Sequence, residues 1–357
     1  GSMHGTVVLL PKKIAGKNNS EVDLFWVYNS FSLCIRALSV FALFFLEGRL
    51  KGSIVLMIAL GAWLSQYVEN TQVLLGAKLE FFKQNLIRVV DEVLRPLLIL
   101  CFFVMNKSVE ALFVASTVTA FLAFLVALCF IRPYFKCLNL ATYGAVLQEI
   151  YRIGFFIYMI WAIDIVFRTI DRWFIALFYS VEELATYGFV SSLSINVWLL
   201  AMSFFAPYSQ LLYKYVAEGQ YADVKMLIEK TNKRLYVFTG LIAMAALSLY
   251  PFLLDFVVKK YFGSEFLFSL LVISFVFLSI NCMYVYYMIS NNLHFFLLKY
   301  QGIILAGNLG LNAIFALFHL NIVFFSYSTI VTLVLYFFLV RRRFYIDILQ
   351  KIEACNG

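Results

Sequence analysis

Four ionisable side chains interrupt a long apolar stretch at residues 163–178, which reads IDIVFRTIDRWFIALF. Asp164, Arg168, Asp171 and Arg172 have spacings of four, seven and eight residues from the first, which places them on one face of a helix. Carboxylates and guanidinium groups that are three or four residues apart on a helix can form ion pairs. The spacing therefore allows two kinds of chemistry: ion pairs that only orient neighbouring helices, or a charged surface that binds a ligand.

The same kind of residue recurs near the middle of other apolar stretches, at Arg36 and Arg95. A charge at the centre of a bilayer costs at least ~2.5–3.5 kcal/mol on insertion scales, so such residues normally face the interior of a helix bundle. Arginine suits phosphate in particular, because its guanidinium group donates two parallel hydrogen bonds. We expect these side chains to line a wet cavity for an anionic substrate. The predicted substrate-binding residues are Arg36, Arg95, Asp164, Arg168, Arg172, Asn281 and Asn308.

Of the four charged residues in 163–178, we assign substrate binding to Arg168 in particular, whereas Asp171 is expected to be structural. The acidic groups Glu69, Asp91, Glu92 and Asp164 are the candidates for coupling transport to a proton or sodium gradient. No catalytic residue is predicted. The six cysteines and three histidines are too scattered to form a metal site, so no metal or cofactor is expected either.

The elements that carry these residues are predicted to be transmembrane helices. The chain has 357 residues, of which 63% are hydrophobic and 13% charged, far more apolar than a soluble domain. Runs of about 20 residues can cross a ~30 Å hydrocarbon layer. We expect an all-α, polytopic bundle of about ten helices at 25–46, 54–75, 84–105, 109–131, 153–179, 186–213, 235–258, 266–290, 297–319 and 321–340. A separate short amphipathic helix is predicted within 214–234, at the membrane interface.

The loops predict the orientation of this bundle. One alternating set of loops, which includes both termini, holds most of the Lys and Arg residues outside the helices. Because cytoplasmic loops are enriched in these residues, both termini are predicted to be cytoplasmic. This bias accounts for most of the net charge of +8, so nucleic acid is not an expected partner. The opposite set holds only Arg49, Lys51, Lys107, Lys259 and Lys260.

Three segments resemble a known family of transporters. IDRWFIALFYSVEELATYGFVSSL (170–193) is similar to the seventh helix and following loop of the Wzx-type O-antigen and polysaccharide flippases, within the MATE-like multidrug/oligosaccharidyl-lipid/polysaccharide (MOP) exporter superfamily. LLGAKLEFFKQNLIRVVDEVLRPLLIL (74–100) resembles the stretch joining their fourth and fifth helices, and LKYQGIILAGNLGLNAIFAL (298–317) their eleventh. The chain departs from the pattern at Ala185, where the family has Gly, and in HLNIVFFSYS before the last helix.

The resemblance implies two bundles, of which the first is incomplete. Members usually have twelve helices, so the ten predicted here would correspond to helices three to twelve, and GSMHGTVVLLPKKIAG resembles the end of helix two and the loop after it. The domains expected on this basis are an incomplete N-terminal bundle of about four transmembrane helices at 1–140, a six-helix bundle at 141–345 and a cytoplasmic tail at 346–357.

The resemblance also implies a function. A multi-pass protein of the bacterial inner membrane would flip a polyprenyl-diphosphate-linked oligosaccharide, such as a repeat unit of O-antigen, capsule or exopolysaccharide, to the outer leaflet by alternating access. Its partners would be this lipid-linked oligosaccharide, membrane lipid and polysaccharide assembly proteins. The alternatives are a multidrug or metabolite antiporter, a lipid II flippase, or a membrane-embedded polymerase or glycosyltransferase. An enzyme is disfavoured because the outward loops are too short for a catalytic domain.

Overall fold

The structure is a computed structural model that describes residues 9–10, 52–106, 109–132, 140–256 and 259–356. The predicted first helix, 25–46, lies outside these residues, and so does Arg36. Nine long helices of the described part coincide with the other nine predicted stretches. They are α3 (Gly52–Ala77), α4 (Phe81–Asn106), α5 (Val109–Ile131), α6 (Leu140–Phe178), α7 (Val181–Ala217), α8 (Tyr221–Phe256), α9 (Glu265–Ser290), α10 (His294–Leu317) and α11 (Val323–Asn356).

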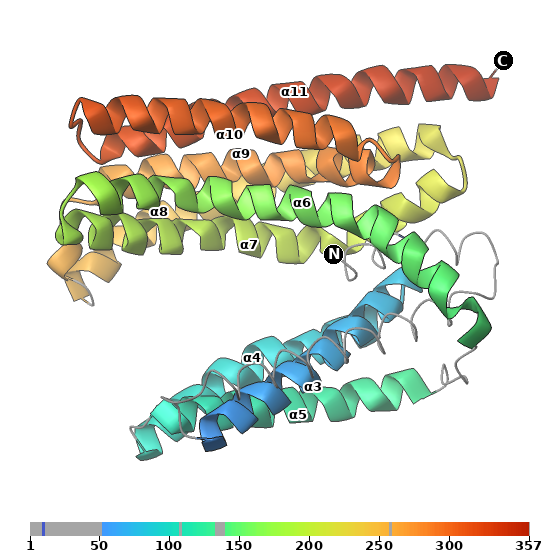
Figure 1. Ribbon diagram of the computed structural model, residues 1–357, viewed down its shortest axis with the longest axis horizontal. Helices are drawn as coiled ribbons and strands as arrows, with labels where there is room; N and C mark the ends of the chain where they lie inside the picture. The colour runs from blue at the N-terminus through green and yellow to red at the C-terminus, as the bar shows by residue number, and fades with distance from the viewer. Residues whose placement is uncertain (1–8, 11–51, 107–108, 133–139, 257–258, 357) are drawn as a thin grey trace. The chain divides into compact units, whose positions relative to one another are not determined.

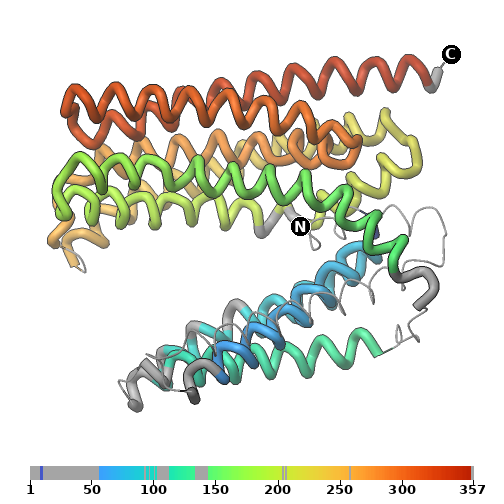
Figure 2. Tube along the Cα trace, in the orientation of Figure 1, coloured from blue at the N-terminus to red at the C-terminus, as the bar shows by residue number. Residues whose placement is uncertain are grey.

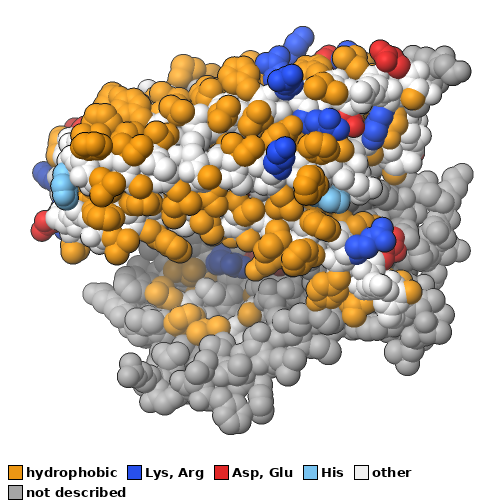
Figure 3. Space-filling model, turned by 45° about the horizontal axis from the view of Figure 1, so that its top comes forward, with side chains coloured by type: hydrophobic (Ala, Val, Ile, Leu, Met, Phe, Trp, Pro, Cys, Tyr) orange, Lys and Arg blue, Asp and Glu red, His pale blue; other side chains and the backbone are white. Residues whose placement is uncertain are grey.

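Seven of the described helices, α5 to α11, are long and apolar enough to cross a membrane. Large hydrophobic side chains are exposed along them, for example Leu249, Phe252 and Phe338, which are 58–64% accessible. Figure 3 shows such side chains over the length of the visible helices, as expected for a surface that faces lipid. The prediction of an all-α transmembrane bundle is confirmed.

Several helices continue well beyond the apolar stretches that predict them. The 39 residues of α6 span about 58 Å at 1.5 Å per residue, roughly twice the hydrocarbon thickness. The predicted short helix within 214–234 is wrong as a separate element: α7 runs to Ala217, and α8 begins at Tyr221 and continues across the membrane. Hydropathy detects only the lipid-crossing section of a helix, whereas backbone hydrogen bonding continues into the polar sequence on either side.

The predicted tail, 346–357, is also largely helical, as the last turns of α11. Phe344 and Ile348 in this region are fully buried. The Tyr287 hydroxyl of α9 donates a 2.7 Å hydrogen bond to the Asp347 carboxylate, which also pairs with Lys351 at 3.6 Å. The end of α11 is therefore packed against α9.

The chain divides into two compact units, 1–155 and 156–357, with the boundary inside α6. In the first unit, α3 and α4 both pack against α5. Gly61 allows α3 to approach α5 closely, because an added Cβ would lie 3.3 Å from the Thr117 hydroxyl. Small residues at such crossings are typical of helix packing in membranes. The buried core of this unit includes Val68, Leu75 and Ile87.

The second unit is built from most of α6 and from α7 to α11, which run lengthwise alongside one another (Figure 1) and can be followed in chain order in Figure 2. Helix α9 packs against α7, α8 and α11, and its residues Leu271 and Val272 lie in the buried core. The turns between consecutive helices are short; α6 and α7, for example, are separated by two residues.

Helix α7 begins at a capping box. The Ser180 hydroxyl accepts a hydrogen bond from the Glu183 backbone N–H (3.2 Å), and the Glu183 carboxylate accepts one from the Ser180 backbone N–H (3.0 Å). Both bonds satisfy donors that a helix otherwise leaves unpaired at its N-terminus.

Removing this cap gives a first prediction. Ser180→Ala is expected to lower the free energy of unfolding by about 1 kcal/mol, because the Glu183 N–H loses its acceptor. Thermal unfolding in detergent should show a small decrease in Tm. The matched control is Ser248→Ala, since Ser248 is also exposed but lies inside α8. Equal Tm values for both variants would contradict a stabilising role for the cap.

Candidate functional site

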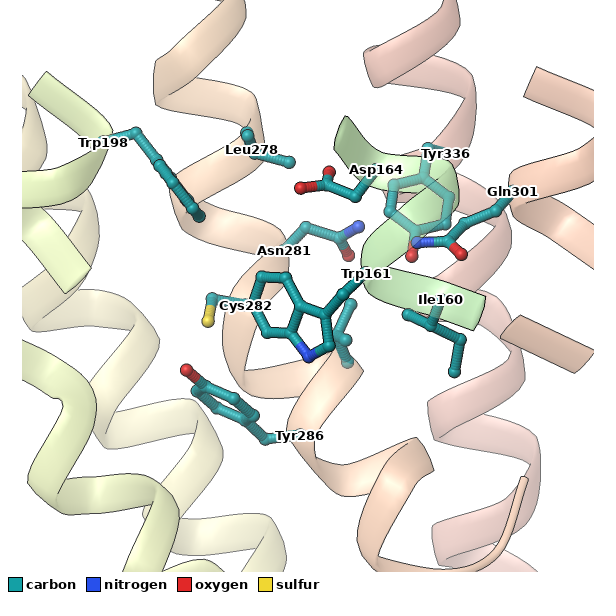
Figure 4. A pocket seen from close by; sticks show the side chains of 11 residues that line it. Ile160, Trp161, Asp164, Trp198, Leu278, Asn281, Cys282, Tyr286, Gln301 and Tyr336 are labelled. Carbon is teal, nitrogen blue, oxygen red and sulfur yellow. The ribbon is translucent and has the colours of Figure 1, made fainter. Parts of the chain in front are cut away.

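A cavity within the second unit is lined by side chains from five helices, α6, α7, α9, α10 and α11 (Figure 4). It contains about 480 Å³ of empty space, including its open mouth. Two of its lining residues, Asp164 and Asn281, are among the predicted site residues. The others are mostly aromatic or aliphatic, so the cavity combines a few polar groups with apolar walls, as small-molecule sites usually do.

Asp164 and Arg168 form an ion pair beside this cavity. The Arg168 Nη2 atom lies 2.7 Å from Asp164 Oδ2, and the side chains are 17% and 14% accessible. The guanidinium carbon also lies 4.9 Å from the centre of the Trp198 ring, a cation–π distance. Arg168 is thus held between a carboxylate and an indole, and its charge is neutralised within the protein.

Asn281 is the least satisfied polar group of the cavity. Its side chain is 1% accessible, and neither its Oδ1 nor its Nδ2 has a hydrogen-bond partner among the described residues. A buried amide without partners typically costs about 1–3 kcal/mol, so native proteins rarely keep one without a reason. The Gln301 Oε1 atom of α10 and the Tyr336 hydroxyl of α11, which also line the cavity, likewise have no hydrogen-bond partner among the described residues.

Asp171 lies one turn beyond Arg168, in a separate buried network. Its carboxylate accepts hydrogen bonds from the Tyr187 hydroxyl (2.7 Å), the Asn312 amide (2.6 Å) and the Thr329 hydroxyl (2.7 Å). These donors belong to α7, α10 and α11, so one carboxylate connects four helices. The geometry is that of a structural centre, in agreement with the structural role predicted for Asp171.

Asn308 belongs to this network and not to the cavity lining. Its Oδ1 accepts a 2.6 Å hydrogen bond from the Asn312 amide, and its own amide donates to the Thr332 hydroxyl at 3.5 Å. The Ser328 hydroxyl completes the network by donating to Asn312 Oδ1 at 2.6 Å. Arg172 has different partners: its guanidinium donates to the hydroxyls of Ser191 (2.8 Å) and Ser192 (3.4 Å) on α7.

The remaining predicted site residues belong to the first unit. Arg95 and Asp91 on α4 form an ion pair, as their spacing predicts. Glu69 is half-buried on α3, one residue before Asn70, whose side chain accepts a 2.8 Å hydrogen bond from Gln66. Glu92 lies on α4, but its side chain is outside the described part of the structure. Across the described residues, no cluster of His, Cys, Asp or Glu is placed to hold a metal ion.

The sequence did not indicate most of the cavity lining. Trp161 is one turn before Asp164 on the same helix, which is a usable signal. Trp198, Tyr286, Gln301 and Tyr336 come from four other helices, and in this aromatic-rich sequence nothing distinguishes them from core residues. Only helix packing brings them together.

A second hollow lies between α7 and α8. It is an open groove of about 1000 Å³, to which α7 contributes Phe205 and Tyr208. The Arg234 guanidinium donates a 3.3 Å hydrogen bond to the Tyr208 hydroxyl. The groove is therefore apolar with a cationic edge. Its α8 residues are Lys233, Arg234, Val237, Phe238 and Leu241.

Comparisons with known proteins identify the fold. No protein-family model and no curated protein matches the sequence. A solved multidrug resistance MATE family transporter of the MOP superfamily, in an outward-facing conformation, superimposes with a TM-score of 0.78 at 11% identity, over 99% of this chain and 84% of that one. The bent form of the Vibrio cholerae MATE transporter VcmN gives 0.77 at 15% identity, over 98% and 85%.

A third solved structure is a MOP superfamily transporter from Pyrococcus furiosus, for which a binding pocket of reverse polarity suggests a different function. It superimposes with a TM-score of 0.65 at 15% identity, over 97% of this chain and 84% of that one. Likeness at this level of identity establishes architecture. The chain is therefore a multi-pass helical membrane protein with the fold of the MATE transporters of the MOP superfamily.

Proposed function

We propose that the protein is an alternating-access transporter that moves a polyprenyl-diphosphate-linked oligosaccharide across the bacterial inner membrane, from a cytoplasmic side that holds both termini. The observation that carries this proposal is the pair of hollows along α7. Trp198 in the cavity and Phe205 in the groove are seven residues apart, or about 10 Å along the helix. An aromatic-lined cavity with a few polar groups, next to an apolar groove with a cationic edge, suits a ligand with a sugar at one end and a lipid at the other.

The cations best placed for the diphosphate in this unit are Lys233 and Arg234. Within the described part of the chain neither forms an ion pair, whereas Arg168 already pairs with Asp164. The apolar residues beside them, such as Val237 and Leu241, would contact the start of the polyprenyl chain. Arg36 and Arg95 remain predicted ligands contributed by the first unit, and Arg172 remains a further candidate.

Translocation in proteoliposomes tests this proposal. A fluorescent polyprenyl-diphosphate oligosaccharide should become accessible to an added lectin only in vesicles that contain the protein. Lys233→Gln with Arg234→Gln should lower the rate at least tenfold, because hydrogen bonds to charged groups contribute roughly 1.5–3 kcal/mol each.

The control for this experiment is Lys259→Gln with Lys260→Gln, which removes two exposed cations from the 3-10 turn (Lys259–Tyr261) without touching the groove. If the Lys233 and Arg234 changes leave the translocation rate unaffected, the diphosphate does not bind in the groove. Failure of the unchanged protein to translocate the lipid would refute the proposed substrate.

A multidrug antiporter is the second candidate, because two of the solved structures above are MATE transporters, one of them a multidrug resistance protein. The Asp164 carboxylate in an aromatic cavity would suit an organic cation if it were unpaired. Its pairing with Arg168 removes that attraction. Efflux of a cationic dye from the same vesicles, without movement of the lipid-linked sugar, would favour this alternative.

A further inference from the structure

We infer that the cavity lined by Trp161, Asp164, Trp198, Asn281, Tyr286 and Gln301 is a subsite for uncharged sugar rings. This inference rests on the proposed function, because it assigns the oligosaccharide end of the substrate to a particular place in the second unit.

The aromatic walls supply one half of sugar recognition. A pyranose ring has an apolar face of C–H groups, which gains by leaving water for the flat face of an aromatic ring. Trp161 of α6, Trp198 of α7 and Tyr286 of α9 surround the cavity with such rings (Figure 4). The Arg168 guanidinium, 4.9 Å from the centre of the Trp198 ring, also restrains this indole. Trp198 is thus positioned by a group outside the cavity lining.

The polar groups of the cavity supply the other half of sugar recognition. Neighbouring hydroxyls of a sugar both donate and accept hydrogen bonds, so they match an amide, which has a carbonyl acceptor and an NH₂ donor. Asn281 offers both atoms without a partner among the described residues, at 1% accessibility, and it lines the cavity. An apolar drug in the same place would leave the amide unpaired, which selects for a hydrogen-bonding ligand.

The charges favour an uncharged sugar over an acidic or cationic one. Asp164 lines the cavity, whereas Arg168 does not, so an acidic sugar would meet a carboxylate and not a cation. A cationic ligand would have to compete with Arg168, which holds the Asp164 carboxylate at 2.7 Å. A hydroxyl can donate to this carboxylate without displacing the arginine.

Ligand binding to the purified full chain in nanodiscs tests the inference. Tryptophan fluorescence would be titrated with uncharged trisaccharides of gluco, galacto and N-acetylglucosamine type, with trigalacturonate as the acidic probe and tetraphenylphosphonium as the cationic probe. At least one uncharged trisaccharide should change the emission saturably. Asn281→Leu should weaken this binding at least tenfold, and Trp161→Phe should weaken it less.

Stability separates a binding role from a structural role for Asn281. Because the amide has no partner in the described structure, Asn281→Leu should leave Tm unchanged or raise it, whereas loss of a structural amide would lower it. The matched control is Asn196→Leu on α7, an exposed amide outside the cavity whose loss should leave saccharide binding unchanged.

The inference is overturned if none of the uncharged trisaccharides binds, if Asn281→Leu binds them as well as the unchanged protein does, or if the acidic or cationic probe binds more tightly. If saccharide binding depends on Asn281 but the lipid-linked sugar is not translocated, the sugar subsite is supported and the proposed transported substrate is refuted. Translocation by Asn281→Leu at the full rate, without saccharide binding, would refute the subsite alone.

Discussion

Asp171→Ala is expected to lower the free energy of unfolding by about 2–5 kcal/mol. The change removes the common acceptor of Tyr187, Asn312 and Thr329, and with it three hydrogen bonds between helices. Interhelical hydrogen bonds in membrane proteins contribute roughly 0.6 kcal/mol on average and up to about 1.7, which sets this range for three bonds. Reversible unfolding in mixed detergent micelles measures the difference.

Two further variants make this result specific. Asp255→Ala removes an exposed carboxylate from α8 and should change stability by less than about 0.5 kcal/mol. Asp171→Asn keeps one carbonyl acceptor and should cost less than Asp171→Ala. If Asp171→Ala unfolds like the unchanged protein, Asp171 does not hold α6 to α7, α10 and α11.

Arg168→Met is expected to be as damaging, by a different mechanism. It leaves Asp164 as an uncompensated charge inside a transmembrane helix, and breaking one side of a buried ion pair typically costs about 3–5 kcal/mol. The double variant Asp164→Asn with Arg168→Met removes both charges together. It should recover most of the lost stability, because an uncharged pair of similar volume avoids the desolvation of two ions. Thermal unfolding of both single variants and the double variant completes the cycle.

The double variant also decides what Arg168 does in transport. Because Asp164 already neutralises Arg168, we expect the double variant still to translocate the lipid-linked sugar, but more slowly, since it loses the Asp164 acceptor and the cation over Trp198 in the sugar subsite. A stable double variant that no longer translocates would instead assign the Asp164–Arg168 pair to the substrate, since the sequence predicts both residues as ligands. Either result separates ligand binding from the orientation of helices.

The amino-acid sequence by itself determined the class of the protein and the position of its helices. Continuous apolar runs of this length are most stable in lipid, so each of the nine long described helices contains a predicted stretch, and seven of them are apolar enough to cross a membrane. Local spacing also identified two ion pairs, Asp91–Arg95 and Asp164–Arg168, because residues four apart on a helix are neighbours whatever surrounds them. The resemblance to MOP exporters agrees with the fold, while the Wzx-type substrate remains a proposal.

Several partners lie within reach of each charged side chain along its helix, and the tertiary structure decides which of them it contacts. Arg168 has an aspartate four residues before it and another three residues after it, and spacing cannot choose between them. Helix packing determines that Arg168 pairs with Asp164, because Asp171 accepts hydrogen bonds from donors on α7, α10 and α11, whereas Asp164 faces the cavity. For the same reason Asn281 and Asn308, which are both predicted to bind the substrate, lie in different environments. Local spacing fixes the face of a helix, but only its neighbours determine what that face meets.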